Sequence, residues 1–342
     1  MKAMILAAGL GTRLSPYTDV LAKPAIPFLN IPLLYYSIAL TQAAIELSVD
    51  EYIINSHHKP EQIKQLTRDL SKNPNLKSLK TTTTFENEKP LGSGGGVWFA
   101  REHFTNGEDF IVTNGDEVIL PTHLKIMDQM LKQHRNSKAL VTLLVKRDSR
   151  VGTQFGGAWA NSRGRVFGFG KINPNEVPAQ KCKEPNLEAF HYVGVLMMNK
   201  RAMKYFPDGE SNILYDAAMS AHHAGEKIEV FIDDCRWYET GNIKDYLHAT
   251  EQVLEELRKN PKDVFINELL KKFAPGSHLQ IQKEAMIFAD KSVKIPSSAK
   301  LTGFVVLGPD VKVPDGCELH NVVVRENAIL RPQSYKEDLI LK

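Results

Sequence analysis

The chain has 342 residues, of which 42% are apolar and 24% are charged, and its formal net charge is +3. This ordinary globular composition, with both signs of charge mixed along the chain, excludes a basic nucleic-acid stripe and a polybasic membrane anchor. Every apolar stretch is shorter than the roughly 20 residues that span a bilayer. The three cysteines, Cys182, Cys235 and Cys317, lack disulfide-framework or metal-ligand spacing, so we expect reduced thiols in a cytoplasmic protein.

Strand-like and helix-like segments alternate over the first two-thirds of the chain. The expected strands are residues 2–7, 51–55, 79–84, 109–113 and 139–145. The expected helices are residues 32–46, 60–70, 96–104, 121–134, 211–222 and 243–257. Such alternation implies a mostly parallel sheet with helices on both faces. Residues 155–198 are richer in strands, which adds antiparallel pairs, so we predict a Rossmann-like α/β domain with a mixed sheet over residues 1–258.

A linker is expected at residues 259–277, where a short helical piece, VFINELLKKF, precedes the breaker Ala274-Pro275-Gly276-Ser277. Beyond it, eight positions that are six residues apart are all apolar: Ile287, Val293, Ala299, Val305, Val311, Cys317, Val323 and Ile329. Such a run arises by chance about one time in a thousand per register. A period of six is the hexapeptide signature of a β-helix, in which each short strand buries one residue inside. The pattern resembles the left-handed β-helix family. We therefore predict a short left-handed β-helix over residues 278–342.

The first predicted strand leads into a glycine-rich segment, LAAGLGTRLSP at residues 6–16, which Lys23-Pro24 follow. Backbone N–H groups of such a loop can hold phosphates, and glycine allows their close approach. Arg13 offers a planar fork of donors to phosphate oxygens, and Lys23 a compact charge. The P-loop pattern is absent, and Leu14 stands where a dinucleotide fingerprint needs its third glycine. From the glycines alone, a simple tight turn remains an equal alternative.

The longer string LAAGxGTRLxPxT at residues 6–18, followed by KPxxP at 23–27, resembles the opening signature of the sugar-1-phosphate nucleotidyltransferases. Further segments resemble this family in the same order, which extends the likeness from residue 3 to about residue 250. They are Asn30–Leu33, Pro90–Gly96, Asn114–Asp116, His191–Val195 and Trp237–Asn242. A β-helix tail is also common in the family, especially among guanylyltransferase-like members.

The resemblance implies transfer of a nucleotidyl group from a nucleoside triphosphate (NTP) to a sugar 1-phosphate, by in-line attack on the α-phosphorus. Catalysis would rest on positioning and neutralising the two anionic substrates. Arg13 and Lys23 would hold the triphosphate, and Asp116 and Glu239 would hold Mg²⁺, the implied cofactor.

The resemblance also implies which residues surround the other parts of the substrates. The nucleotide-binding residues would be Leu6, Ala7, Ala8, Gly9, Gly11, Thr12, Glu86, Asn87, Glu88, Gly92 and Ser93. The sugar-phosphate residues would be Asn114, Gly157, Lys171 and Gly194.

Three departures from the family pattern leave the substrates open. Glu239 replaces the second metal aspartate, and the E-K-P element reads Gly170-Lys171-Ile172. The Gly-Ser-Gly-Gly-Gly loop resembles that of uridylyltransferases for N-acetylmuramic acid 1-phosphate, whereas the tail resembles guanylyltransferases. A carboxylate suits the donors of guanine and an amide such as Asn87 suits uracil. We favour GTP with a mannose- or heptose-type sugar; UTP with an N-acetylated sugar is the alternative.

Two further alternatives concern the kind of protein. A catalytically silent regulatory homologue is one, for which Glu239 is the supporting feature. A bifunctional enzyme whose β-helix transfers acyl groups is the other, with His320 as the histidine of the repeat. We expect a homo-oligomer, because a short β-helix has open ends and apolar sides. Neither a nucleic-acid partner nor a membrane is expected.

Overall fold

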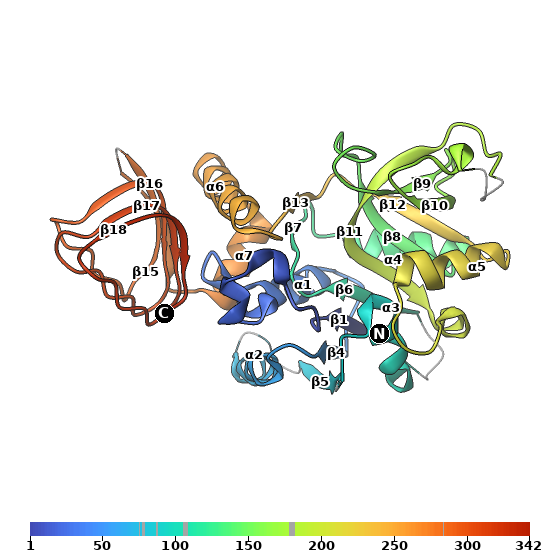
Figure 1. Ribbon diagram of the computed structural model, residues 1–342, viewed down its shortest axis with the longest axis horizontal. Coiled ribbons are helices and arrows are strands. Elements are labelled where there is room, and N and C mark those ends of the chain that lie inside the picture. Colours follow the sequence, from blue (N-terminus) through green and yellow to red (C-terminus); the bar gives the residue numbers. More distant parts are fainter. Residues whose placement is uncertain (75, 77–78, 87, 105–108, 178–181, 283) are drawn as a thin grey trace. The chain divides into compact units, whose positions relative to one another are not determined.

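The computed structural model (Figure 1) describes residues 1–74, 76, 79–86, 88–104, 109–177, 182–282 and 284–342. It divides into two compact units, each built from separate stretches of the chain. Unit 1 comprises Met1–Gly9, Leu40–Gly115 and Pro121–Trp237. Unit 2 comprises Leu10–Ala39, Asp116–Leu120 and Tyr238–Lys342. Among the described residues, no helix is long and apolar enough to cross a membrane.

Unit 1 is built on a mixed sheet whose parallel part has the order β6-β1-β4-β5. These strands are β1 (Lys2–Leu6), β4 (Glu51–Ser56), β5 (Lys80–Phe85) and β6 (Asp109–Asn114). The long strand β11 (Glu188–Asn199) pairs antiparallel with β6, and β8 (Val141–Lys146) pairs antiparallel with β11. β12 (Ile228–Ile232) lies parallel to β8. The short hairpin β9 (Gly157–Ala160) and β10 (Val166–Gly170) joins the first residues of β11. The predicted mixed α/β sheet is therefore confirmed.

The helices of unit 1 pack on this sheet because their apolar sides need a partner. α2 (Pro60–Lys72) contacts β5, α3 (Gly92–Phe99) contacts β1, and α4 (Ile126–Ser137) contacts β8 and β11. Short helical turns complete the unit. They are η4 (Arg101–Phe104), η5 (Pro174–Glu176), η7 (Lys200–Tyr205), the π-helical η8 (Ile213–Ala218) and α5 (Met219–His223).

The helix predicted at residues 96–104 begins four residues earlier, because the glycine run itself is helical as part of α3, which ends at Phe99 before η4. A Cβ added at Gly92, Gly94 or Gly95 would lie less than 3.0 Å from atoms of residues 209–211 or Leu91. Gly94 N–H also donates to the Ser211 carbonyl at 2.8 Å. Tertiary packing against this neighbouring backbone therefore overrides the poor helix propensity of glycine.

Unit 2 begins with three short turns, η1 (Thr12–Leu14), η2 (Tyr17–Asp19) and η3 (Lys23–Ala25). The hairpin β2 (Pro27–Phe28) and β3 (Ile31–Pro32) follows, with Leu29 at φ 47° and Asn30 at φ 62° in its two-residue turn. Two central residues with positive φ match the twist of a tight hairpin. α1 (Leu33–Gln42) starts one residue later than the predicted 32–46 because Pro32 belongs to β3, and it ends four residues earlier, at Gln42. The short strand β7 (Val118–Leu120) belongs to unit 2, and β13 (Arg236–Tyr238) enters it at Tyr238.

The C-terminal part of unit 2 contains α6 (Ile243–Lys259), α7 (Val264–Phe273) and a five-stranded sheet. α7 coincides with the helical piece predicted in the linker. The strands are β14 (Ser277–Ile281), β15 (Ala285–Asp290), β16 (Lys300–Leu307), β17 (Glu318–Val324) and β18 (Ser334–Ile340). β14 is antiparallel to β15, and the later strands are parallel.

The predicted six-residue register holds for the first strands of this sheet and then slips by one residue. Ile287, Val305, Val311 and Cys317 are buried in one cluster. Leu301 pairs with Leu319 but Val305 pairs with Val322, because β16 carries one more residue than β17 between these pairs. After the slip, the members of this cluster are Val322, Val324, Ala328 and Leu330, whereas Val323 is buried outside it. Ile329, predicted to be inside, is 75% exposed.

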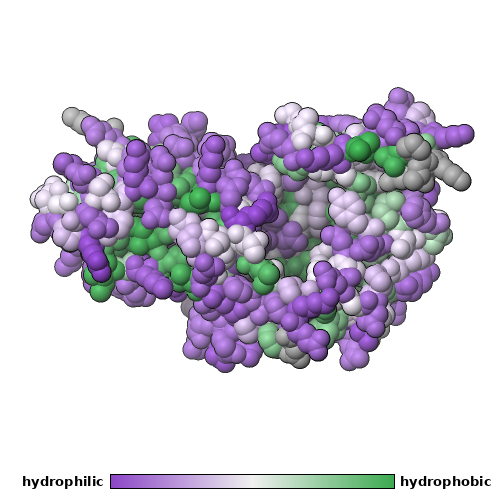
Figure 2. Space-filling model, in the orientation of Figure 1, coloured by the Kyte–Doolittle hydropathy of each residue, from purple (hydrophilic) through white to green (hydrophobic). Residues whose placement is uncertain are grey.

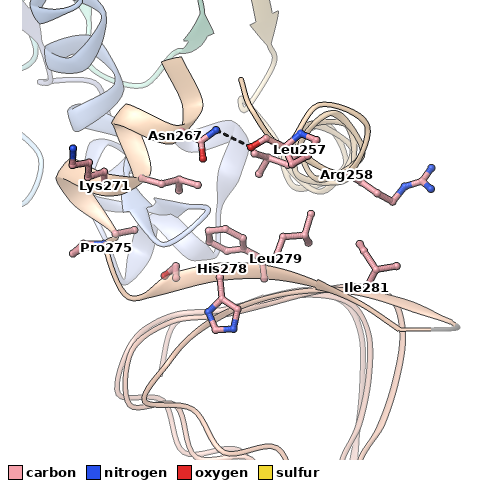
Figure 3. A pocket seen from close by; sticks show the side chains of 13 residues that line it. Leu257, Arg258, Asn267, Lys271, Pro275, His278, Leu279 and Ile281 are labelled. Carbon is pink, nitrogen blue, oxygen red and sulfur yellow. Dashed lines mark hydrogen bonds between the residues drawn. The ribbon is translucent and has the colours of Figure 1, made fainter. Parts of the chain in front are cut away.

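Apolar side chains gather over the C-terminal strands on the face drawn in Figure 2. Here α6, α7 and β14 border a groove of about 510 Å³ (Figure 3). Leu257, Leu270, Leu279 and Phe288 contribute apolar surface to it, and Lys271 a charge. These lining residues lie outside the predicted site.

Candidate active site

In unit 2, the residues around Gly11 have a backbone that requires glycine. Gly11 has φ 65°, and a Cβ there would lie 2.8 Å from Thr18 Cγ2 and 3.1 Å from Lys23 Cβ. The Thr18 hydroxyl donates to the Gly11 carbonyl at 3.2 Å. Within η1, Leu14 is fully buried, whereas Thr12 and Arg13 are exposed. The fold therefore presents the predicted residues of this turn at the surface of unit 2.

Lys23 and Asp116 form an ion pair, with 2.7 Å between Lys23 Nζ and Asp116 Oδ2. Lys23 is only 8% exposed, while the Asp116 side chain keeps 31% of its surface accessible. Burial alone lowers the pKa of Lys23, but the carboxylates of Asp116, Glu117 and Glu239 outweigh it and raise the pKa overall. The ammonium group is therefore charged and faces a carboxylate that water and ligands can reach.

Glu239 and Arg13 lie beside this pair. Thr240 Oγ1 donates to the Asp116 carbonyl at 2.9 Å, and Gly241 N–H donates to Glu239 Oε1 at 2.8 Å. A Cβ at Gly241 would lie 2.9 Å from Arg13 Nη2, so the guanidinium group packs over this glycine. Asn242, whose side chain accepts from Asp245 N–H at 3.0 Å, caps α6 directly after it.

Unit 2 thus brings together two cations and two carboxylates that the sequence places far apart. Carboxylate oxygens are the ligands that Mg²⁺ prefers. Within the described ranges, no group of three or more His, Cys, Asp or Glu side chains converges to hold a metal ion. A metal at Asp116 and Glu239 would therefore need ligands from substrate or water as well.

In unit 1, the carboxyl ends of three parallel strands meet. Leu6 of β1 pairs with Asn55 of β4 on one side and with Asn114 of β6 on the other. Ala7 N–H donates to Asn55 Oδ1 at 2.7 Å. Ala7 and Ala8 are buried and Gly9 is exposed. Ligands of open α/β sheets bind at this edge, so the predicted residues of the first loop lie where the fold favours a site.

Glu86 is buried at 1% exposure and joins the first loop to the second. Its Oε1 accepts from Asn55 Nδ2 at 2.6 Å, and its Oε2 accepts from Leu91 N–H at 2.7 Å. The carboxylate therefore points into the protein. Glu88 is exposed, and Asn87 lies outside the described residues. The sequence analysis missed Asn55, for which a polar residue at the end of the buried strand YIIN was the available signal.

The second loop leads into α3, where it holds the predicted Gly92 and Ser93. Gly92 is exposed with φ 72°, and Ser93 Oγ accepts from Ile213 N–H at 3.0 Å. Deeper in the helix, a Cβ at Gly96 would lie 2.6 Å from Asn55 Nδ2 and 3.0 Å from Glu86 Oε1. The glycine run thus lets α3 pack against the Asn55–Glu86 pair.

The four predicted sugar-phosphate residues fall into two groups along β11. Gly194, with φ 87°, precedes Val195, which pairs with Thr113, so Gly194 lies at the Asn114 end of β6. Gly157 pairs with Gly170 on the β9–β10 hairpin, directly before Lys171. Lys171 is exposed and its Nζ donates to the Thr153 carbonyl at 3.1 Å.

Between these groups, His191 lies among aromatic rings. Its ring centroid is 4.5 Å from that of Phe155 and 4.2 Å from that of Trp237. Burial lowers the pKa of His191 to about 4, so the imidazole is neutral at pH 7. Arg150, which is paired with Asp148 at 2.6 Å, lies over Phe155 and Trp237. Sequence reasoning noted His191 only as part of a motif and missed this cluster.

Comparison with known proteins covers nearly the whole chain. The chain is 26% identical to a UTP–glucose-1-phosphate uridylyltransferase of Synechocystis sp., over 97% of this chain and 84% of that protein. It is 25% identical to mannose-1-phosphate guanylyltransferase 1 of Arabidopsis thaliana, over 93% of this chain and 77% of that protein. A glucose-1-phosphate thymidylyltransferase of Streptomyces griseus is 26% identical over 75% of this chain and 66% of its own.

Solved structures share the fold at lower identity. A UDP-glucose pyrophosphorylase complexed with UDP-glucose aligns with a TM-score of 0.59 at 15% identity, over 75% of this chain and 98% of that one. HddC from Yersinia pseudotuberculosis, complexed with GMP-PN, aligns with a TM-score of 0.55 at 18% identity, over 74% and 99%. The model of the nucleotidyl transferase family matches residues 2–256. Because this match covers well over half of the 342 residues, the chain belongs to the nucleotidyl transferase family.

Proposed function

We propose that this chain transfers a nucleotidyl group from an NTP to a sugar 1-phosphate and releases pyrophosphate. The observation that carries the proposal is the Lys23–Asp116 pair, which lies beside Glu239, Arg13 and the turn at Gly11. The names of three relatives support it, since each names a sugar 1-phosphate as the acceptor.

The mechanism follows from charge. An oxygen of the sugar phosphate attacks the α-phosphorus in line, and the protein stabilises the charge that develops on the leaving pyrophosphate. Arg13 is exposed on η1 and provides a planar fork for phosphate oxygens. Lys23 lies 2.7 Å from the accessible carboxylate of Asp116, and its ammonium group would bind a phosphate oxygen of the NTP.

Asp116 and Glu239 would hold Mg²⁺, and their chemistry fits the ion. Asp116 has an accessible carboxylate, and Glu239 accepts the Gly241 N–H bond through Oε1. Bound there, Mg²⁺ would neutralise phosphate charge and act as a Lewis acid. Lys23 offsets part of the negative charge of Asp116.

The nucleoside would be recognised near Gly92, Ser93 and Glu88, and the sugar phosphate near Asn114, Gly157, Lys171 and Gly194. We favour GTP with a mannose- or heptose-type sugar, which the guanylyltransferase relative and the C-terminal sheet support. UTP with an N-acetylated sugar is the alternative, supported by the Gly-Ser-Gly-Gly-Gly loop and by the uridylyltransferase relative. Glu86 is buried and bonded to Asn55 and to Leu91 N–H, so it would position the loop that borders the base rather than contact the base.

The test is a pyrophosphate-release screen with Mg²⁺. It crosses four NTPs with glucose, mannose, N-acetylglucosamine, N-acetylmuramic acid and heptose 1-phosphates. One active pair, lost in Asp116→Ala but kept in the exposed helix variant Asp69→Ala, would support the reaction and name both substrates. Activity that survives Asp116→Ala would refute the role of Asp116.

One observation favours a catalytically silent homologue as a second candidate. Glu239 stands where the family pattern has aspartate, and its carboxylate turns back to the amide of Gly241. A silent protein would stay inactive with every pair of substrates, and Glu239→Asp would then restore turnover if the side-chain length alone prevents metal binding.

We also propose that residues 278–342 form a left-handed β-helix, as a domain separate from residues 1–258 and the linker 259–277. The parallel strands support a helical coil, since β15 and β16 pair with an offset of 18 residues, three hexads. Self-association through this sheet, in the cytoplasm, completes the proposal. A monomer mass by light scattering at micromolar concentration would refute the oligomer.

A further inference from the structure

Tyr17 connects two parts of unit 2 that are far apart in the sequence. It lies between Arg13 and Lys23 in the sequence. We call residues 10–25, which contain all three side chains, the Arg13–Lys23 segment. The Tyr17 hydroxyl donates to Oδ1 of Asp338, which belongs to β18, at 2.6 Å. The first segment of unit 2 is therefore tied to the last strand of the C-terminal sheet by a charge-assisted hydrogen bond.

The backbone around Tyr17 passes this constraint on to the glycine turn. The Tyr17 carbonyl accepts from Val20 N–H and Leu21 N–H, both at 3.0 Å, which closes η2. Thr18, the next residue, donates to the Gly11 carbonyl and packs on Gly11. The position of Tyr17 thus determines where Thr18 lies below Gly11, two residues before Arg13.

A second contact anchors the chain just beyond Lys23. Asn30, in the β2–β3 turn, donates from Nδ2 to Ser277 Oγ of β14 at 3.0 Å and to the Leu307 carbonyl of β16 at 2.9 Å. Lys23 therefore lies between two points, Tyr17 and Asn30, at which the chain is bonded to the C-terminal sheet. Buried apolar side chains from these strands, among them Ile287, Val305 and Val322, form one cluster. Close packing of such a cluster resists deformation.

We propose that the C-terminal sheet positions the Arg13–Lys23 segment for NTP binding, with Asp338 as a positioning residue that acts through Tyr17. The inference rests on the proposed function, because it assigns the segment to the triphosphate. Burial, and then Asp338, raise the pKa of Tyr17 to about 12, so the hydroxyl stays a donor throughout any enzymatic assay. Asp338 touches no reacting atom in this scheme; it orients a segment that does.

The kinetic test compares Tyr17→Phe, Asp338→Ala and Asp338→Asn with wild type in the pyrophosphate-release assay. We expect Tyr17→Phe and Asp338→Ala each to raise KM for the NTP by about tenfold, as the loss of one charge-assisted hydrogen bond predicts. KM for the sugar 1-phosphate and kcat should change less than about threefold. Asp338→Asn keeps an acceptor oxygen and should restore most of the NTP affinity. The neighbouring exposed variant Lys336→Ala is the matched control.

A double mutant separates the bond from general damage. Tyr17→Phe combined with Asp338→Ala should raise KM for the NTP no further than either single change, because both remove the same bond. Additive effects, or an unchanged KM in both single variants of an active enzyme, would overturn the proposal.

Hydrogen exchange supplies a readout that needs no turnover. The amides of Asp19, Val20 and Leu21 are bonded within η2, and they should exchange faster in Asp338→Ala than in wild type or Lys336→Ala. If wild type is inactive with every substrate pair, the proposed function fails, and exchange alone then decides whether the sheet holds the segment. Unchanged exchange of these three amides would overturn the positioning role, whatever the activity.

Discussion

Two polar clusters of this protein differ in what surrounds them. In unit 1, Asn55 and Glu86 are 1% exposed. Their side chains bond to each other, and they accept from Ala7 N–H and Leu91 N–H. In unit 2, Lys23 faces an Asp116 side chain that is 31% accessible, and Arg13 is exposed.

This difference in exposure distinguishes polar groups that stabilise the fold from polar groups that can bind a ligand. A buried carboxylate whose two oxygens both accept hydrogen bonds from the protein holds those segments in place. Losing any of these bonds costs folding free energy, because a buried polar group is then left without a partner. A charged pair with one accessible member can exchange its partner for a ligand at small cost. Glu86 therefore shapes the loops, and the Lys23–Asp116 pair is the better candidate for contact with phosphate and metal.

The largest effect is expected at the pair in unit 2. Lys23→Met should lower kcat for pyrophosphate release by about 10²- to 10³-fold, because a preorganised positive group at the developing charge is lost. The free energy of unfolding should fall by only about 1 kcal/mol, since methionine fills the same space and Asp116 can hydrate. Assay kinetics and urea unfolding measure the two quantities. A large loss of stability with little loss of kcat would reverse the comparison.

The second-largest effect is expected in the free energy of unfolding, at the Asn55–Glu86 pair of unit 1. Asn55→Ala leaves the Ala7 amide and one oxygen of Glu86 without their bonds in a buried place, so we expect a loss of about 3 kcal/mol in unfolding free energy. Urea denaturation measures it, with the exposed Gln65→Ala on α2 as the control, which should change stability by about 0.5 kcal/mol or less. Equal stabilities of the two variants would show that the Asn55–Glu86 network is dispensable.

A smaller effect is expected when α3 is pushed away from the same network. Gly96→Ala places a methyl group 2.6 Å from Asn55 Nδ2, which should cost about 2 kcal/mol even after the gain in helix propensity. In the Asn55→Ala background the space is open, so the second substitution should cost much less. Additive losses in the unfolding free energies would mean that positions 96 and 55 are not energetically coupled.

The smallest effect concerns a buried carboxylate at the opposite end of β4. Burial alone raises the pKa of Glu51, but Thr82, Lys80 and Lys2 outweigh it and lower the pKa from 4.5 to about 2. A lowered folded pKa contributes stability above the unfolded pKa, and this contribution is lost as pH falls from about 4.5 towards 2. Glu51→Gln should therefore cost about 1 kcal/mol at pH 7 and progressively less in acid. Chemical unfolding at several pH values checks this; a constant difference would contradict it, and kcat should not change.

The sequence by itself determined the local elements and the family. Apolar runs such as residues 2–6 and 109–114 are strands because their side chains need burial on both faces of a covered sheet. The string from Leu6 to Pro27 predicted the nucleotidyl transferase family, which is confirmed. The α7 helix coincided with its predicted segment because propensity and amphipathic pattern agree there.

Other features were decided by tertiary structure alone. The glycine run of α3 is helical because Ser211 and its neighbours lie against it, and the six-residue repeat slips by one because β16 is longer than β17 between its paired residues. Asn55 meets Glu86, and Tyr17 meets Asp338, across 31 and 321 residues. Pattern rules read neighbours along the chain, whereas these contacts depend on which strand ends the topology brings together. Local periodicity therefore predicted the elements, and packing between distant segments selected the partners of their polar side chains.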